Sequence, residues 1–523
     1  MNRTEQTAKT LARSFIEGKL TRRELIERAS LFGVSLSAVG AVLSGASLQP
    51  QGALAAASGD LKIAISADID TTDPHVSQLL MMNDVIRSPV FNSLVKYGPN
   101  LDLLPSLAES WTNPDDKTYV FKLRQGVKYH DGTALQASDV QSSFERVAAK
   151  KTIFSSRVAN VDNYKVIDPQ TIQITLKTPQ ADFLDGLIFL SVISPAIAAN
   201  VDKKPIGTGP FKFVEWVPND HISLAANPDY FESGVPNVAT VTWNVLTQPQ
   251  VEIANLQSKT VDAVLTIPLS QAAPFKGSSS VNAVIVPTSA IETFELMGKN
   301  SKPVQTNASV RQALAYCLDK DAIQKTVFSG EGKLKWSWIP TTSWAYKDEA
   351  GYPYDPEKAK SLLQTAGVSN LSLTVIIPSG YPDGVQAATI WQAGLAKAGI
   401  TLKQEVQELS VWVNNYVNRT YDVTWNAWPG FADPNYFVSY GLKPLWGDTW
   451  NNPTAAKLGD DANATIDQNK RKDLYGQLQD IFVQEMPVIV IAEVPQAALT
   501  LPSVTGWDIN PIGATHLDNV KIS

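Results

Sequence analysis

Hydrophobic and polar residues alternate along this chain with two periods, which predict strands and helices in succession. Residues 171–176 (TIQITL) place an apolar side chain at every second position, as in a half-buried strand. Residues 355–367 instead show helical spacing, with Asp355 suited to the N-cap, Pro356 to the first turn and Gly367 to the C-terminal end. Both patterns recur over the chain, so we predict an α/β protein.

The order of these patterns is most informative after residue 370. It predicts a strand, a helix, a strand, a helix and a strand over residues 371–377, 384–399, 400–407, 409–419 and 421–426. A βαβαβ succession implies parallel strands joined by right-handed crossovers. Ligands of such sheets bind outside the carboxyl ends of the strands. We therefore expect the loops 378–384, 408–410 and the segment from 427 to lie side by side at a binding face.

The third loop belongs to an aromatic stretch, WNAWPGFADPNYF, at residues 425–437. We expect Trp428 to stack on a ligand from this loop, whereas Trp425 suits the core and the site equally. Asp433 precedes Pro434, so it serves either an Asx-turn or ligand contact. The candidate ligand-binding residues are Trp425, Asn426, Trp428, Phe431, Asp433 and Tyr436, with Tyr381 and Glu408 from the other two loops.

The net charge and the cysteine content limit the classes of partner and of covalent cross-link that we expect. The 523 residues carry a formal net charge of −7, and no segment after the N-terminus is dense in lysine and arginine. A nucleic-acid partner is therefore not expected. The single cysteine, Cys317, rules out an internal disulfide and lies on an apolar helical stripe, so we expect it to be buried.

Residues 1–57 have the composition of an export signal. Arg22 and Arg23 precede an apolar run, and small residues follow at Ala53 to Ser58. The paired arginines resemble a twin-arginine signal. The run 31–48 contains four serines and three glycines, which weakens a transmembrane alternative. We expect removal of the signal near Ala55–Ser58 and a periplasmic location.

A search for a catalytic centre finds little. No G-x-S-x-G nucleophile motif occurs, and His75, His130, His221 and His516 lack the spacing of a metal site. We predict no catalytic residue, no metal site and no cofactor. One alternative stays open, a secreted hydrolase that uses the carboxylates of Glu408 and Asp433, since glycosidases work through such a pair.

Several segments taken in order resemble one family. They are LLPSLAESWTNPDDKTYVFKLRQGVKYHDGTALQASDVQSSFERV (103–147), PIGTGPFKFVEWVPNDHISLAANPDYF (205–231), VRQALAYCLDKDAI (310–323), YPYDPEKAKSLLQTAG (352–367) and DPNYF (433–437). The chain is similar to the extracytoplasmic solute-binding proteins of ABC importers in the dipeptide, oligopeptide and nickel group, family 5. The resemblance spans nearly all of the chain after the export signal.

This resemblance implies a two-lobed periplasmic binding protein fold, the large type II form, with an extra domain inserted in the N-terminal lobe. It places lobe I at 58–90, 205–288 and 499–523, the inserted domain at 91–204 and lobe II at 289–498. It further implies a non-enzymatic, monomeric receptor that encloses peptides or peptide-like solutes between its lobes and delivers them to the transmembrane permease.

The loop from 428 departs from the family. In peptide-binding members the corresponding loop has a sequence similar to W-x-G-D-x-x-D-P, and the resemblance implies that its first aspartate receives the α-ammonium of the peptide. This chain has WPGFADP, with Phe431 near the charged position. An opine, a glycoside or an oligosaccharide is therefore an alternative ligand. A sensory receptor that presents its ligand to a membrane signalling protein is an alternative role.

Overall fold

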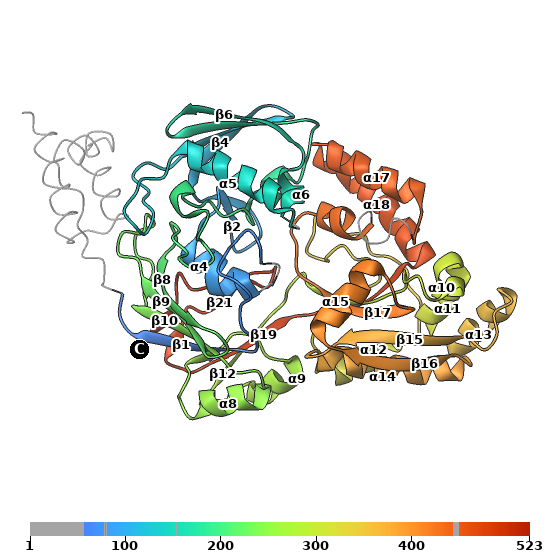
Figure 1. Ribbon diagram of the computed structural model, residues 1–523. Coiled ribbons are helices and arrows are strands. Elements are labelled where there is room, and N and C mark those ends of the chain that lie inside the picture. Colours follow the sequence, from blue (N-terminus) through green and yellow to red (C-terminus); the bar gives the residue numbers. More distant parts are fainter. Residues whose placement is uncertain (1–56, 78, 80, 153, 443–448) are drawn as a thin grey trace, which may run out of the picture.

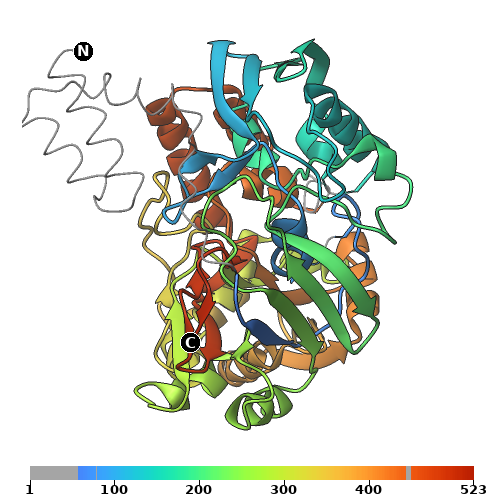
Figure 2. The same ribbon diagram turned by 90° about the vertical axis from the view of Figure 1, so that its left-hand side faces the viewer.

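The computed structural model describes residues 57–523 except 78, 80, 153 and 443–448, so residues 1–56 of the predicted export signal lie outside it. Three sheets organise these residues (Figure 1). The largest has seven strands, in the order β12 (Asn282–Val286), β19 (Gln496–Thr500), β11 (Ala263–Val264), β1 (Asp60–Ile65), β10 (Thr240–Val245), β9 (His221–Ala226) and β8 (Phe211–Val217). Figure 2 shows β8, β9 and β10, in green, as its antiparallel outer edge.

The second sheet has six strands. Their order is β14 (Lys333–Leu334), β18 (Val488–Glu493), β13 (Ile291–Glu295), β17 (Val423–Trp428), β15 (Ser372–Pro378) and β16 (Thr401–Gln407). The predicted βαβαβ succession is confirmed: β15 pairs in parallel with both β16 and β17, and the crossovers are α14 (Pro382–Lys397) and α15 (Leu409–Asn418). Strand β18 is buried along its whole length.

The end of β17 differs from the prediction. We expected the strand to finish at Asn426, but the structure continues it to Trp428. Ala427 and Trp428 pair with Glu292 and Ile291 of β13, so the antiparallel ladder extends the strand by two residues. Pro429 has no backbone N–H to contribute to a ladder, and the strand ends there. The loop thus begins at Pro429.

The third sheet has four strands, and all of them lie between β1 and β8 in the sequence. Its order is β4 (Ala108–Asp115), β5 (Thr118–Leu123), β7 (Thr171–Leu176) and β6 (Val161–Asp168). The helix α5 (Ala137–Lys150) packs on it, followed by the short helices α6 (Ser155–Val158) and α7 (Phe183–Leu187). Its side chains form a hydrophobic core of their own. We call residues 91–204 the four-strand unit.

The remaining elements surround these sheets. Three short pairs of strands are β2 (Val95–Tyr97) with β3 (Leu103–Pro105), β20 (Val504–Thr505) with β23 (Lys521–Ile522), and β21 (Asp508–Ile509) with β22 (Thr515–His516). The other helices include α8 (Pro249–Gln257), α11 (Ala308–Tyr316), α12 (Lys320–Thr326), α13 (Pro356–Thr365), α16 (Asn435–Phe437), α17 (Pro453–Ala464) and α18 (Gln468–Glu485). No helix in the described part of the chain is long and apolar enough to cross a membrane.

Three expectations about single residues are confirmed. Asp355 caps α13 by accepting a hydrogen bond from the backbone N–H of Lys358, and Pro356 opens the helix. Cys317 is fully buried in the core that the six-stranded sheet shares with its helices.

The chain passes between the two larger sheets at two places, between β12 and β13 and between β18 and β19. The predicted domain boundaries themselves stay a prediction.

Candidate functional site

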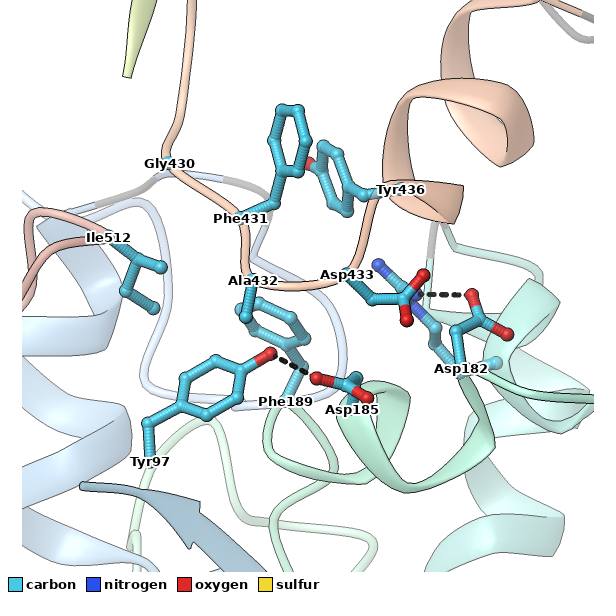
Figure 3. A pocket seen from close by; sticks show the side chains of 11 residues that line it. Tyr97, Asp182, Asp185, Phe189, Gly430, Phe431, Ala432, Asp433, Tyr436 and Ile512 are labelled. Atoms are coloured by element: carbon cyan, nitrogen blue, oxygen red, sulfur yellow. Dashed lines mark hydrogen bonds and ion pairs between the residues drawn. The ribbon is translucent and has the colours of Figure 1, made fainter. Parts of the chain in front are cut away.

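A partly open pocket, called the cavity below, lies against the loop that follows β17 (Figure 3). Gly430, Phe431, Ala432 and Asp433 of this loop form one wall, and Tyr436 of α16 continues it. The opposite side comes from the four-strand unit and the C-terminal segment; its residues are Tyr97, Arg157, Asp182, Asp185, Phe189 and Ile512. Segments from both ends of the chain thus meet at the loop that the sequence placed on a binding face.

Asp433 holds the loop in place. Its Oδ1 accepts a hydrogen bond from the backbone N–H of Asn435 at 2.8 Å, the Asx-type contact expected ahead of Pro434. Both of its carboxylate oxygens also accept hydrogen bonds from Arg471 of α18. Burial raises the pKa of Asp433, while the Arg471 guanidinium opposes that shift. Because Asp433 already has these partners, its role in the loop is structural as well as cavity-lining.

The loop packs tightly on the C-terminal segment at Gly430. A Cβ atom added there would lie 2.6 Å from Cα of Ile512 and 2.6 Å from Oγ of Ser289. These distances are well inside van der Waals contact, so only glycine fits. The backbone N–H of Phe431 donates to the same Ser289 hydroxyl at 3.1 Å. The two contacts fix where the Phe431 side chain leaves the backbone.

Aromatic rings form much of the cavity wall. Phe431 and Tyr436 stack with ring centroids 5.2 Å apart and an interplanar angle of 17°. The guanidinium carbon of Arg157 lies 5.3 Å from the centre of the Tyr436 ring and 5.5 Å from that of Phe189. Such surfaces exclude water and accept the apolar faces of a ligand.

Two further carboxylates face the cavity from the start of α7. Oδ2 of Asp182 accepts a hydrogen bond from the side-chain amide of Asn435 at 2.8 Å. Oδ1 of Asp185 accepts one from the hydroxyl of Tyr97 at 2.9 Å, which Figure 3 shows as a dashed line. Burial, reinforced by the nearby Asp433 carboxylate, raises the pKa of Asp185 to about 7. The cavity therefore holds a carboxylate poorly compensated by its surroundings.

Of the eight candidate residues, the cavity brings together Phe431, Asp433 and Tyr436. Trp428 is instead buried, with 6% of its surface exposed, and its indole N–H donates to Oε1 of Glu295 on β13 at 2.9 Å. Asn426 donates to the same oxygen at 2.9 Å. These two side chains belong to a hydrogen-bonded cluster beneath the loop and do not line its cavity.

The other three candidates lie elsewhere on the six-stranded sheet. Trp425 is 1% exposed and packs against the ring of Tyr381, with centroids 5.3 Å apart. Tyr381 itself is 44% exposed. Glu408 is exposed and caps α15 by accepting from the backbone N–H of Ser410 at 2.9 Å. Hydrolysis by two carboxylates would require both to face one substrate, and the cavity contains Asp433 without Glu408.

Sequence reasoning missed the residues that the four-strand unit contributes. Asp182 and Asp185 stand three positions apart in ADFLDGL, a spacing that places both on one helical face. That spacing was the available signal, although nothing local relates it to a loop near residue 430. Among the described residues, no group of three or more histidine, cysteine, aspartate or glutamate side chains has the arrangement of a metal site.

Comparisons with known proteins agree with this architecture. The dipeptide-binding protein of Escherichia coli K12 is 29% identical over 484 residues, which cover 84% of this chain and 90% of that protein. The Helicobacter pylori periplasmic binding protein DppA, solved with the peptide STSA, is 25% identical, with a TM-score of 0.79 and coverage of 89% of this chain and 98% of that one.

A third relative binds a different kind of solute. The periplasmic binding protein AgaA of A. tumefaciens R10, solved with agropinic acid, is 26% identical, with a TM-score of 0.79 and coverage of 89% of this chain and 99% of that one. The model of the bacterial extracellular solute-binding proteins, family 5, matches residues 102–448, more than half of the chain. This protein therefore belongs to the bacterial extracellular solute-binding proteins, family 5.

Proposed function

We propose that this protein is the substrate-binding component of an ABC importer and that it captures peptides or peptide-like solutes in the cavity beside the β17 loop. The observation that supports this most is the composition of the cavity wall. One side comes from the loop that follows β17, and the other from α6, α7 and β2 of the four-strand unit. A ligand there would contact both parts at once.

The contacts across the cavity suggest how capture works. The side-chain amide of Asn435 donates to Asp182, and the backbone N–H of Ala181 donates to the carbonyl of Asn463 at 2.9 Å. These bonds join the four-strand unit to segments next to the six-stranded sheet. We infer that they break when the lobes separate and re-form around a ligand, which is hinge closure. The closed form would be the one that the permease recognises.

The domain division accords with this proposal. The seven-stranded sheet would be the centre of lobe I (58–90, 205–288 and 499–523), the six-stranded sheet that of lobe II (289–498), and residues 91–204 the inserted domain. We further propose that the mature protein begins near Ser58, works as a monomer in the periplasm and acts by binding without turning over its ligand.

An opine or oligosaccharide is the second candidate ligand. Phe431 favours such a ligand. Its ring is stacked on Tyr436 in the cavity wall, near the position where the family resemblance implies an aspartate in peptide-binding members. An aromatic face suits the C–H face of a sugar or a sugar–amino acid conjugate. AgaA, a protein of the same fold, was solved with agropinic acid bound.

A binding screen tests the proposal directly. The mature chain from Ser58 is heated with di- and tripeptides, opines and oligosaccharides, and the melting temperature is recorded. A ligand that binds only the native state must raise it. Hits are then titrated by calorimetry and recovered for mass spectrometry. Saturable binding with ligand recovered intact supports a receptor, whereas product formation that Asp433→Asn abolishes would establish a hydrolase instead.

The transport role needs a cellular measurement. Uptake of a radiolabelled hit is compared between cells with and without the gene. Loss of uptake supports delivery to a permease, while unchanged uptake with a lost transcriptional or chemotactic response would identify a sensory receptor.

A further inference from the structure

The charges in the cavity do not balance. Asp433 has Arg471 as its ion-pair partner. Oδ2 of Asp182 lies 3.9 Å from Nη1 of Arg157, and the Asp182 carboxylate accepts hydrogen bonds from the side-chain amides of Asn435 and Gln180. Asp185 accepts one hydrogen bond from the neutral Tyr97 hydroxyl, and in the described part of the chain no lysine, arginine or histidine forms an ion pair with it.

Asp185 is also in a position to meet a ligand. It lines the cavity from α7, opposite the loop that carries Phe431 and Asp433 (Figure 3). The bond from Tyr97 engages Oδ1 and orients the carboxylate. The Phe189 ring lies beside it in the same wall. A negative charge held among rings and removed from bulk water is strongly stabilised by a positive charge placed next to it.

The loop itself does not supply an uncompensated negative charge to the cavity. Its one carboxylate, that of Asp433, is occupied by Arg471, and Phe431 contributes an uncharged ring. We propose that Asp185 binds an ammonium group of the ligand, so that this receptor selects solutes that carry one, such as a free peptide amino terminus or the amine of an opine. This inference rests on the proposed function, because it assumes that the cavity is the ligand site.

The inference reverses an expectation from the sequence. Phe431 in the loop suggested a cavity with no carboxylate for a free amine. The structure supplies a carboxylate from the four-strand unit instead, on the opposite wall. The ammonium group would then face α7, and the apolar part of the ligand would face the stacked rings of Phe431 and Tyr436. Recognition would thus be divided between the two sides that close on the ligand.

The experiment uses matched pairs of probes. Alanyl-phenylalanine and alanyl-alanyl-phenylalanine are titrated into the mature protein, each as the free peptide and as its N-acetyl form, which lacks the ammonium charge. Wild type should bind the free peptide about 10- to 100-fold more tightly, the usual worth of a charge-assisted hydrogen bond. Asp185→Asn keeps the shape and removes the charge, so it should reduce this discrimination to near unity. Octopine, whose amine is internal, has no acetylated partner in this test, so it is titrated into wild type and Asp185→Asn, and the variant should bind it about 10- to 100-fold more weakly.

Asp162→Asn is the matched control. It removes one exposed carboxylate from β6 of the same unit, outside the cavity, and should keep the full discrimination of wild type. It therefore separates a local effect of Asp185 from a change in net charge. Thermal unfolding without ligand shows whether Asp185→Asn is folded.

A measurement on the wild type alone keeps the inference testable if that variant does not fold. The preference for free over acetylated peptide is measured at pH 5.5 and pH 7.0, because the α-ammonium of the peptide, with a pKa of about 7.7–8.0, keeps most of its charge over this range. Since the pKa of Asp185 lies at about 7 without ligand, the preference should grow as pH rises. The charged and titratable groups around Asp185 are Tyr97 of β2, Asp182 of its own turn, Asp433 of the loop, Arg471 of α18 and Arg157 of α6, which lines the same cavity. The pKa of Tyr97 is raised well above its ordinary value, first by burial, so it stays neutral over this range.

The possible results separate the two proposals. Equal binding of free and acetylated peptides, or discrimination that survives Asp185→Asn, overturns the role of Asp185 and leaves the receptor function intact. Binding confined to oligosaccharides has the same meaning, because they carry no ammonium group. If no peptide, opine or oligosaccharide binds, the proposed function itself fails.

Discussion

Arg471 donates from one nitrogen, Nη2, to both carboxylate oxygens of Asp433, at 2.7 and 2.9 Å, and both side chains are buried. This contact ties α18 to the loop that lines the cavity. A buried ion pair adds little net stability compared with apolar residues, but removal of one partner leaves an uncompensated charge. The pair therefore matters most as a constraint on where the loop lies.

Arg471→Met should destabilise the protein by about 3–5 kcal/mol, because Asp433 would keep its burial and lose its cation. Urea unfolding followed by tryptophan fluorescence measures the change. Lys457→Met is the control, since Lys457 pairs with Asp461 on the exposed surface of α17. That substitution should cost no more than about 1 kcal/mol. Similar losses in both variants would contradict a structural role for the buried pair.

Gly430→Ala should displace the loop, because its Cβ would clash with Ile512 and Ser289. We expect a loss of about 1–3 kcal/mol in stability, the usual cost of overpacking, together with weaker ligand binding in titration calorimetry. Gly476→Ala is the matched control on α18, where the nearest atom to an added Cβ is 3.9 Å away. Helix propensity predicts a gain of about 0.5–1 kcal/mol there. Equal tolerance of both changes would refute the close packing at Gly430.

Phe431→Ala and Trp428→Phe should separate the cavity wall from the cluster beneath it. Phe431→Ala removes the ring stacked on Tyr436 and should weaken ligand binding by about 1–3 kcal/mol. Trp428→Phe removes the donor to Glu295 and should cost about 1–3 kcal/mol of folding stability with little change in affinity. If Trp428→Phe weakened binding as much as Phe431→Ala, the indole would contact the ligand, as the sequence suggested.

The stability of the ligand-free protein should depend on pH through Asp185. Its pKa is about 7 when folded, raised by burial and by Asp433, and about 3.9 when unfolded. Between these two values the folded state binds a proton at Asp185 that the unfolded chain has lost, so this stabilising contribution is present below about pH 4 and is lost progressively as pH rises from there to about 7. Relative to wild type, Asp185→Asn should gain about 1.4 kcal/mol per pH unit between pH 5 and 6.5. Urea midpoints at several pH values measure it, and Asp162→Asn should show no such trend.

The elements around β17 show how far local patterns reach. The βαβαβ succession and the position of the loop at a sheet edge followed from periodicity alone, since each strand and helix carries its own alternation of apolar residues. The Asx-type contact of Asp433 was likewise readable, because it needs only the two residues that follow. The end of β17 was not, because Ala427 and Trp428 extend the strand only through pairing with β13.

The roles of the tryptophans were harder to predict for a related reason. A tryptophan in sequence offers both a stacking face and a hydrogen-bond donor. Which of these is used at position 428 depends on Glu295, which reaches the indole from a neighbouring strand 133 residues away in sequence. Trp425 and Tyr381 pack against each other across two elements in the same way. Spacing along the chain does not encode such contacts.

The sequence by itself determined the βαβαβ succession that leads to the loop, the family resemblance and the loop on which to look for a ligand, because these depend on residues close together in the chain. Only the tertiary structure decided which side chains face that loop. Asp182 and Asn435 meet across 253 positions, and Asp185 reaches the same cavity from α7. Asp185 supplies the negative charge that the loop lacks, since electrostatic interactions depend on distance in space and not on position along the chain.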